Sequence, residues 1–202
     1  MVKHAFYAWA LSIISIQASG FAASMAGLNW VWLPPLALLL LAILLLRVGW
    51  VLVGLKPFRP FTTLGLTALT ITATYIAAQI SVSLLTPPAE YLSRLEQFLP
   101  KNQLELFLSV IMSYLVVAPG EELVFRGVIH AELANSLEKR VATLLSAIIF
   151  AASHLDIYRL FPTLVLGLLT GYSLNKTGSL FPSLIIHGSN NAVAYLISYA
   201  YS

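Results

Sequence analysis

Long apolar stretches separated by short polar turns make up almost the whole chain of 202 residues. A helix needs about 20 apolar residues to cross a bilayer, so the pattern predicts seven membrane spans. Their approximate bounds are 5–28, 31–54, 61–85, 104–136, 140–156, 160–175 and 179–201. The interruptions carry the proline, glycine and charged residues that end helices. The expected fold is therefore all-α, a polytopic transmembrane helix bundle of about seven spans.

One polar interval has a helical pattern of its own. In residues 89–100, charged side chains alternate with apolar ones that recur at helical spacing. This pattern predicts a short helix lying in the membrane interface. Residues 1–100 are thus expected to hold the N-terminal spans and this interfacial helix, and residues 101–202 the remaining spans, within one integral membrane domain.

Composition supports the membrane assignment. The chain is 59% hydrophobic and only 9% charged, against about 25% charged residues in soluble proteins. It has no cysteine and no block of basic residues, so we expect no disulfide framework and no nucleic-acid partner. The protein is expected to be a multi-pass protein of the cell (inner) membrane, although the first apolar stretch could also serve as a signal peptide.

The basic residues also predict an orientation. Seven spans place six of them on one side of the membrane: Lys3, Lys56, Arg59, Lys139, Arg140 and Lys176. Positive charge favours the cytoplasmic side. We therefore expect a cytoplasmic N-terminus and an external C-terminus.

The segment APGEELVFRG at 118–127 places three ionisable groups inside an apolar stretch. A charged side chain at the bilayer centre costs about 2.5 to 3.5 kcal/mol even on insertion scales, so such groups are rare unless paired or functional. Glu122 and Arg126 are four residues apart on one helix face and are expected to form an ion pair. Glu121 points elsewhere and keeps a free carboxylate, as a general base requires. Pro119 and Gly120 predict a kink or an unwound point just before it.

Three more polar side chains are expected at the same depth. Counted from a turn near Glu138, Glu121 lies 17 residues before it and His154 lies 16 after it, so antiparallel helices bring the two to one level. His187 and Asn191 are four apart on the last span and reach a similar level. The small residues Gly167 and Gly171 on the sixth span, with Ala147 and Ala151 on the fifth, would let the helices approach closely.

Each of these features has a structural interpretation when taken alone. A buried Glu–Arg pair is often only structural, and a single histidine on an apolar span is more often a hydrogen-bonded core residue than a catalytic one. Their common depth favours a shared site. His4 and His130 fall outside this layer and are interpreted as incidental.

These residues resemble a known family, the CAAX-protease and bacteriocin-processing (CPBP, or Abi) intramembrane glutamic endopeptidases. The family pattern EExxxR, FxxxH and HxxxN is matched by Glu121, Glu122 and Arg126, then Phe150 and His154, then His187 and Asn191. The resemblance covers about residues 104–200, so it makes 101–202 the expected catalytic core. Three motifs in order, each within a span, form a specific signal.

The resemblance implies a peptidase that needs no covalent intermediate and no cofactor. Glu121 and His154 are expected to activate water for attack on a peptide bond, and His187 and Asn191 to stabilise the oxyanion. Glu122 and Arg126 would hold the helix, with a more direct part for Glu122 left open. The substrate is expected to be a membrane-anchored or lipidated protein cleaved near its terminus.

Two other functions remain open from the sequence. Two carboxylates and two histidines could ligate zinc, which would make the protein a membrane metalloprotease, although the HExxH signature is missing. Intramembrane acids and histidines also form proton relays, so a non-enzymatic transport or immunity protein is the second alternative. The absence of an inverted repeat weighs mildly against a transporter.

Overall fold

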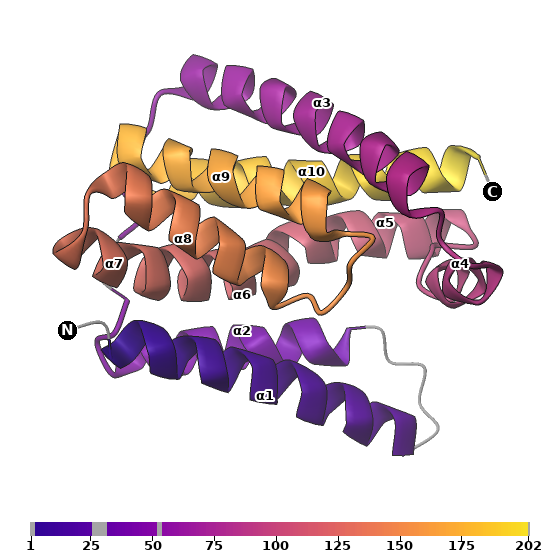
Figure 1. Cartoon of the computed structure of the whole chain (residues 1–202), viewed down its shortest axis with the longest axis horizontal. Helices are drawn as coiled ribbons and strands as arrows, with labels where there is room; N and C mark the ends of the chain where they lie inside the picture. The colour runs from indigo at the N-terminus through magenta and orange to yellow at the C-terminus, as the bar shows by residue number, and fades with distance from the viewer. Residues whose placement is uncertain (1–2, 26–31, 52–53, 202) are drawn as a thin grey trace.

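The computed structural model describes residues 3–25, 32–51 and 54–201, and every regular element in these ranges is a helix (Figure 1). The all-α prediction is therefore confirmed. The separate helices are α1 (Lys3–Met25), α2 (Leu33–Arg47), α3 (Pro60–Leu85), α4 (Ala89–Glu96), α8 (Lys139–Ala152), α9 (Leu160–Thr177) and α10 (Leu180–Ala200). One continuous helix joins α5 (Gln103–Met112), η1 (Ser113–Val117), α6 (Ala118–Glu122), η2 (Leu123–His130) and α7 (Ala131–Ser136).

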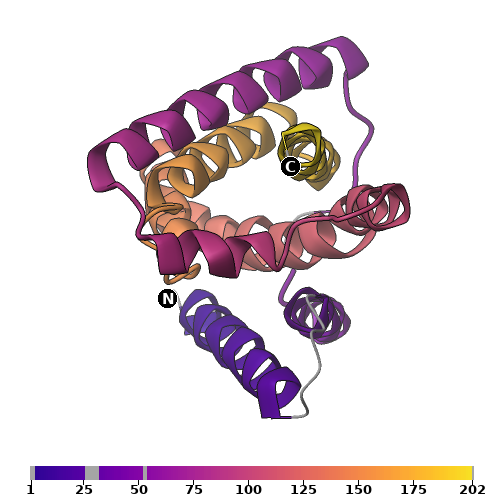
Figure 2. The same ribbon diagram turned by 90° about the vertical axis from the view of Figure 1, so that its right-hand side faces the viewer.

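The long helices run back and forth between the two ends of the bundle, with the N-terminus at one end and the C-terminus at the other (Figure 1). The α1–α2 pair lies along one side and α3 along the opposite side, as the turned view shows (Figure 2). Helix α9 packs against both α8 and α3, and α10 packs against α3, α9 and the long composite helix. Helix α4, which matches the short helix predicted at 89–100, lies across one end.

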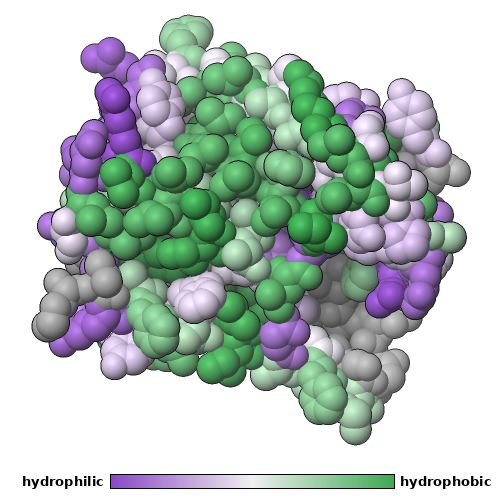
Figure 3. All heavy atoms as spheres, viewed as in Figure 1, coloured by the Kyte–Doolittle hydropathy of each residue, from purple (hydrophilic) through white to green (hydrophobic). Residues whose placement is uncertain are grey.

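The surface has the distribution expected of a membrane protein. Hydrophobic side chains cover the middle of the face in Figure 3, and hydrophilic ones gather toward its left and right ends. Among the described residues, three helical stretches are long and apolar enough to cross a bilayer: Lys3–Ala22, Pro60–Leu85 and Gln103–Ser136. Leu33–Arg47 is apolar but shorter. The seven-span count and the division at residue 100 stay predictions, and residues 26–31, where the first two spans were expected to meet, lie outside the described part.

The basic residues of the predicted orientation gather at one end of the bundle. Lys3 and Lys139 begin α1 and α8, and the Lys56 amide donates to the Ser179 hydroxyl just before α10 (2.9 Å). The beginnings of α1, α3, α8 and α10 lie at this end (Figure 1). Which side of the membrane this end faces stays a prediction.

The structure differs from the sequence analysis at Pro119 and Gly120. The backbone stays helical through both residues, and two π-helical stretches, η1 and η2, lie on either side. Wider π-turns accommodate residues that do not fit an α-helical ladder, as proline does not because it lacks an N–H. A Cβ at Gly120 would lie 3.1 Å from the backbone nitrogen of Leu39. Gly120 therefore serves close packing of α2 against α6 rather than unwinding.

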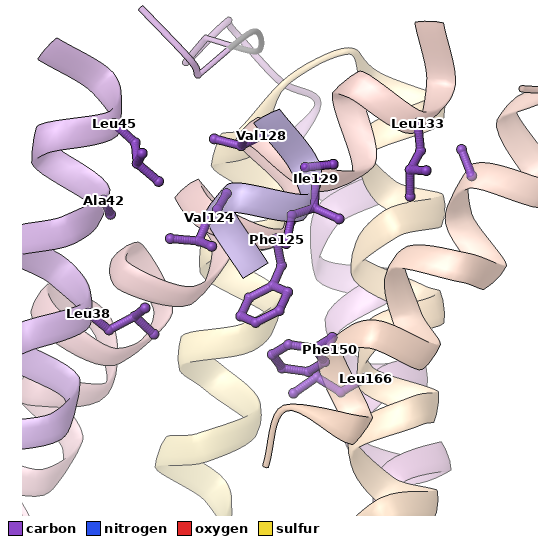
Figure 4. Packing of buried hydrophobic residues seen from close by; sticks show 13 residues of the cluster. Leu38, Ala42, Leu45, Val124, Phe125, Val128, Ile129, Leu133, Phe150 and Leu166 are labelled. Atoms are coloured by element: carbon purple, nitrogen blue, oxygen red, sulfur yellow. The ribbon is translucent and has the colours of Figure 1, made fainter. Parts of the chain in front are cut away.

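A hydrophobic core joins α2, the composite helix and α8. Leu38, Ala42 and Leu45 of α2 face Val124 and Val128, and Phe125 meets Phe150 edge to face with ring centroids 5.1 Å apart (Figure 4).

Glycines let α8 and α9 approach closely beside this core. A Cβ at Gly167 would come within 3.0 Å of Ala147, as the small-residue pattern predicts. A Cβ at Gly171 would likewise lie 3.0 Å from the Thr143 side chain, one turn further along the same contact.

Candidate active site

A cavity of about 580 Å³ opens between α1, α2, the composite helix and α10. Its lining includes Glu121 from α6, His154 from the turn after α8, and His187 and Asn191 from α10. Phe150 also lines it. The structure thus places five of the seven site residues predicted from the sequence around one space, whereas Glu122 and Arg126 lie behind its wall.

Glu122 and Arg126 form the ion pair that their spacing predicts. Arg126 Nε lies 3.2 Å from Glu122 Oε2, and both side chains are fully buried. The guanidinium also donates to the Gly167 carbonyl (3.2 Å) and to the Thr170 hydroxyl of α9. Its carbon lies 4.5 Å from the centre of the Phe150 ring. Because these partners stand on three helices, the arginine ties the composite helix to α8 and α9.

Glu122 has a second contact that the sequence analysis did not specify. Its Oε1 lies 2.7 Å from His187 Nδ1, across from α10. One buried carboxylate therefore joins Arg126 on one side to His187 on the other. Such a contact fixes the orientation of an imidazole ring and directs Nε2 to the opposite side.

Glu121 turns away from this pair, as helical spacing requires. Its Oε2 lies 3.6 Å from His187 Nε2, which is beyond hydrogen-bonding distance, and this buried oxygen has no hydrogen-bond partner among the described residues. The side chain keeps 18% of its surface exposed, toward the cavity. A carboxylate left in this condition has lone pairs available for a water molecule or a substrate proton.

His154 lies outside the helix in which it was expected. Helix α8 ends at Ala152, and Leu155 has a left-handed backbone with a φ of 50°. The His154 amide turns to the Ala151 carbonyl, so the Phe150 carbonyl accepts from the His154 ring instead (Nδ1–O 2.9 Å). A carbonyl only accepts, so Nδ1 carries the hydrogen and Nε2 keeps its lone pair. The FxxxH spacing therefore sets the tautomer of this histidine.

Phe150 is a packing centre for the charged residues. Its ring meets His154 edge to face at 4.9 Å and His187 at 5.9 Å between centroids, besides contacting Arg126 and Phe125. It is fully buried. One aromatic ring thus spaces the two histidines, which explains why a large apolar residue stands in this motif.

Several polar residues of the cavity were not identified from the sequence, among them Tyr195, Asn190 and Arg159. Tyr195 lies four residues after Asn191 on the same face of α10, so helical spacing could have found it. Asn190 is held through its side-chain oxygen by the Thr74 hydroxyl of α3 (2.6 Å). Arg159 precedes α9 in a loop, where no periodic signal exists. His130, interpreted as incidental, is buried with its Nε2 3.2 Å from the Thr143 hydroxyl.

The arrangement of the His, Asp and Glu side chains bears on whether the site could hold a metal ion. Within residues 3–25, 32–51 and 54–201, no three His, Cys, Asp or Glu side chains are arranged as a metal-binding group. The nearest approach to one is the Glu121, Glu122 and His187 cluster, in which Glu122 and His187 Nδ1 already bind each other.

The cavity thus brings one carboxylate and two histidines together inside an apolar helix bundle. Residues 103–193, a little less than half of the chain, match the family model of type II CAAX prenyl endopeptidase Rce1-like proteins. This match confirms that residues 103–193 resemble the CAAX-protease family, as the sequence motifs predict. No curated protein and no solved structure matches the chain.

Proposed function

We propose that the protein is an intramembrane glutamic endopeptidase that hydrolyses a peptide bond of a membrane-associated protein substrate near its terminus. The observation that carries the proposal is the Glu121 carboxylate, which faces the cavity with one oxygen free of hydrogen bonds. His154, His187 and Asn191 line the same cavity. The domain family supports peptide hydrolysis, while the assignment of these roles is our proposal.

In the first step, a water molecule bound between Glu121 and His154 loses a proton. The Nε2 lone pair of His154 accepts a hydrogen bond from the water molecule and orients it. It is free to do so because the other ring nitrogen, Nδ1, bonds to the Phe150 carbonyl. Glu121 takes the other hydrogen as general base. The resulting hydroxide attacks the carbonyl carbon of the scissile peptide bond and forms a tetrahedral intermediate directly, without a covalent enzyme adduct.

In the second step, the oxyanion is stabilised while the C–N bond breaks. Asn191 makes no side-chain hydrogen bond within the described structure, so its amide is available to donate. With Nδ1 against the Glu122 carboxylate, a protonated His187 ring presents Nε2–H to the cavity. Donors held in advance at the position of an oxyanion typically contribute about 3 to 4 kcal/mol each. Glu121 returns its proton to the leaving amine, so that one water yields the two product termini.

Glu122 and Arg126 act as positioning residues in this scheme. The Arg126 contacts hold the Glu122 carboxylate in place, and that carboxylate in turn sets the His187 ring. The buried pair also removes most of the cost of having either charge within the bilayer. Their contribution to catalysis is therefore through His187.

We further propose that the substrate is membrane-anchored or lipidated. The cavity wall includes apolar residues from α1, α2 and the α4 region, among them Leu38, Leu95 and Phe98. Apolar walls of this kind suit a chain held at the membrane. Prenylated proteins are the substrate class suggested by the family name.

Replacing Glu121 with glutamine tests the function directly. The change keeps the size of the side chain but removes the base, so we expect at least a hundredfold loss of cleavage, within the usual range for a lost general base, with normal membrane insertion. The readout is the set of new protein termini in membranes from wild-type and variant cells. Glu90→Gln, on an exposed residue of α4, is the matched control. A Glu121→Gln protein that fully complements a deletion strain would show that proteolysis is not the function and would favour transport or immunity.

Chelation tests the metal alternative. We expect the purified protein to retain cleavage after treatment with a zinc chelator and to contain no stoichiometric zinc. Complete loss of cleavage on chelation, with recovery on adding zinc, would replace water activation by Glu121 and His154 with a metalloprotease mechanism.

A further inference from the structure

The turn that carries His154 has an unusual backbone. Helix α8 ends at Ala152 and α9 begins at Leu160, so residues 153–159 form a loop between them. Within it, Leu155 is left-handed with a φ of 50°, a conformation that a leucine keeps only where the surrounding structure imposes it. The Leu155 side chain is 67% exposed, so its own packing does not impose this shape. The shape must be imposed by contacts elsewhere in the turn.

The first residue of the turn is bonded to α1. The Ser153 hydroxyl donates to the Ile149 carbonyl (2.6 Å) and accepts from the indole N–H of Trp9 (3.1 Å). Ser153 is buried. The residue next to His154 is therefore fixed on both sides of its hydroxyl.

Helix α4 is bonded to the middle of the turn. The Tyr91 hydroxyl donates to Asp156 Oδ2 (2.7 Å), and the Tyr91 ring lies against Tyr158 with centroids 4.4 Å apart. Burial, reinforced by the hydrogen bond to Asp156, raises the pKa of Tyr91, so the phenol keeps its proton and donates. Asp156 Oδ1 accepts from the backbone amides of Tyr158 (3.0 Å) and Arg159 (3.3 Å). One carboxylate therefore joins α4 to the folded shape of the turn.

Helix α3 is bonded to the end of the turn. Ser81, which is fully buried, donates through its hydroxyl to the Tyr158 carbonyl (2.7 Å). Neither Ser81 nor Tyr91 is among the described residues that line the cavity, so both act on the reaction through the turn. Both also precede residue 103, where the match to the peptidase family begins.

We propose that Ser81 and Tyr91 are positioning residues for His154, so that α3 and α4 complete the active site from outside the matched domain. Holding the turn keeps the His154 ring against the Phe150 carbonyl, and that bond leaves the Nε2 lone pair for the catalytic water. A small displacement of such a group slows the chemical step strongly, because the reacting atoms must meet in a narrow geometry. The inference rests on the proposed function, in which His154 orients the water molecule.

The first experiment observes the His154 ring and requires no substrate. The histidines of the purified full-length protein are isotope-labelled, and the His154 signal in nitrogen NMR is identified by its loss in His154→Gln. The chemical shifts of the two ring nitrogens distinguish the tautomers. We expect one tautomer in the wild type, with the hydrogen on Nδ1, and a mixture in Tyr91→Phe and in Ser81→Ala. Unchanged shifts in both variants would overturn the proposal.

The second experiment measures what the turn contributes to cleavage. The substrate is a peptide copied from a cut site found by comparing wild-type and Glu121→Gln membranes. We expect Tyr91→Phe and Ser81→Ala each to lower kcat by about three- to tenfold, as for one lost hydrogen bond. KM should stay nearly unchanged, because neither residue contacts the substrate. A lower thermal midpoint with kcat and tautomer both unchanged would show that the two residues only stabilise the fold, and the proposal would be wrong.

Two matched controls lie on α3. Tyr75→Phe removes a hydroxyl from a half-exposed residue, and Ser83→Ala removes one that bonds to the Gln79 carbonyl of the same helix (2.8 Å). Neither should change kcat or the His154 shifts.

The two experiments also separate this inference from the proposed function. A change of the His154 tautomer without a change of kcat would show that Ser81 and Tyr91 hold the ring but that His154 does not orient the water. A wild-type protein that cleaves nothing would overturn the proposed function, while the nitrogen shifts would still decide whether the two residues hold the ring.

Discussion

The α1–α2 hairpin and the 103–193 domain are both built from apolar helices, yet they differ in what they bury. The hairpin buries small and aliphatic residues, such as Ala8, Ala42 and Leu38, together with the hydroxyl of Ser12. The domain buries ionisable side chains: Glu122, Arg126, His130, Glu132 and His187. Overall hydrophobicity therefore does not separate them, whereas buried charge does.

The hairpin and the domain therefore contribute differently to the cavity: the hairpin shapes its wall, and the domain supplies its charged residues and histidines. The hairpin supplies part of the cavity wall, through Ile16 and Gln17 of α1 and Leu38 of α2, and none of its described lining residues is ionisable. Among the described lining residues, the domain supplies every charged side chain and both histidines: Glu121, Arg159, His154 and His187. An apolar wall of this kind excludes water, and electrostatic interactions inside it become stronger. The comparison predicts that substitutions in the domain disturb charge, whereas substitutions at the contact with the hairpin disturb packing.

The largest effect on stability is expected from breaking the buried ion pair. Arg126→Met leaves the Glu122 carboxylate uncompensated inside the bundle, which should lower the free energy of unfolding by about 3 to 5 kcal/mol. Thermal unfolding of the purified protein measures this loss. Arg140→Met, at a residue whose side chain is 94% exposed, is the control. Equal midpoints for the two variants would show that the pair is not structural.

A smaller effect is expected where the hairpin meets the domain. Gly120→Val would force a side chain against the Leu39 backbone, 3.1 Å from where a Cβ would lie, and such overpacking costs about 1 to 3 kcal/mol. Gly65→Val is the control, because a Cβ there meets nothing within 4 Å. The measurement is the thermal unfolding midpoint of each variant, which should be lower for Gly120→Val than for Gly65→Val. If Gly120→Val is as stable as the control, α2 is not held tightly against α6.

The smallest effect is expected at the start of α1. The first amides of a helix lack partners within the helix, and here the His4 and Ala5 amides donate to the buried Glu132 of α7. Glu132→Gln leaves only one acceptor oxygen, which should cost about 1 kcal/mol. The readout is faster hydrogen exchange in the first turn of α1. Glu138→Gln, on a residue whose side chain is 70% exposed, should leave exchange there unchanged.

The helix pattern could be predicted because its causes are local. Apolar runs and proline-containing breaks predicted α1, α3 and α8 to α10 within about four residues, and the spacing of Glu122 and Arg126 predicted their pair. Helix α2 ends at Arg47, seven residues before the predicted end of the second span. The continuation of the helix through Pro119 could not be predicted in this way. It depends on π-turns and on the close approach of α2 to Gly120, which is a contact between residues distant in the chain.

The sequence by itself determined an all-helical, strongly apolar chain in which seven polar and aromatic residues stand at motif spacing. Hydrophobic periodicity and local composition depend on residues that are close in the chain, so they can be recognised without knowledge of the tertiary structure. Only the tertiary structure decided that Glu122 binds His187, that the ring of His154 donates to the Phe150 carbonyl at the end of α8, and that Arg159 reaches the cavity. These depend on how helices cross and where they end, because packing between distant segments sets both.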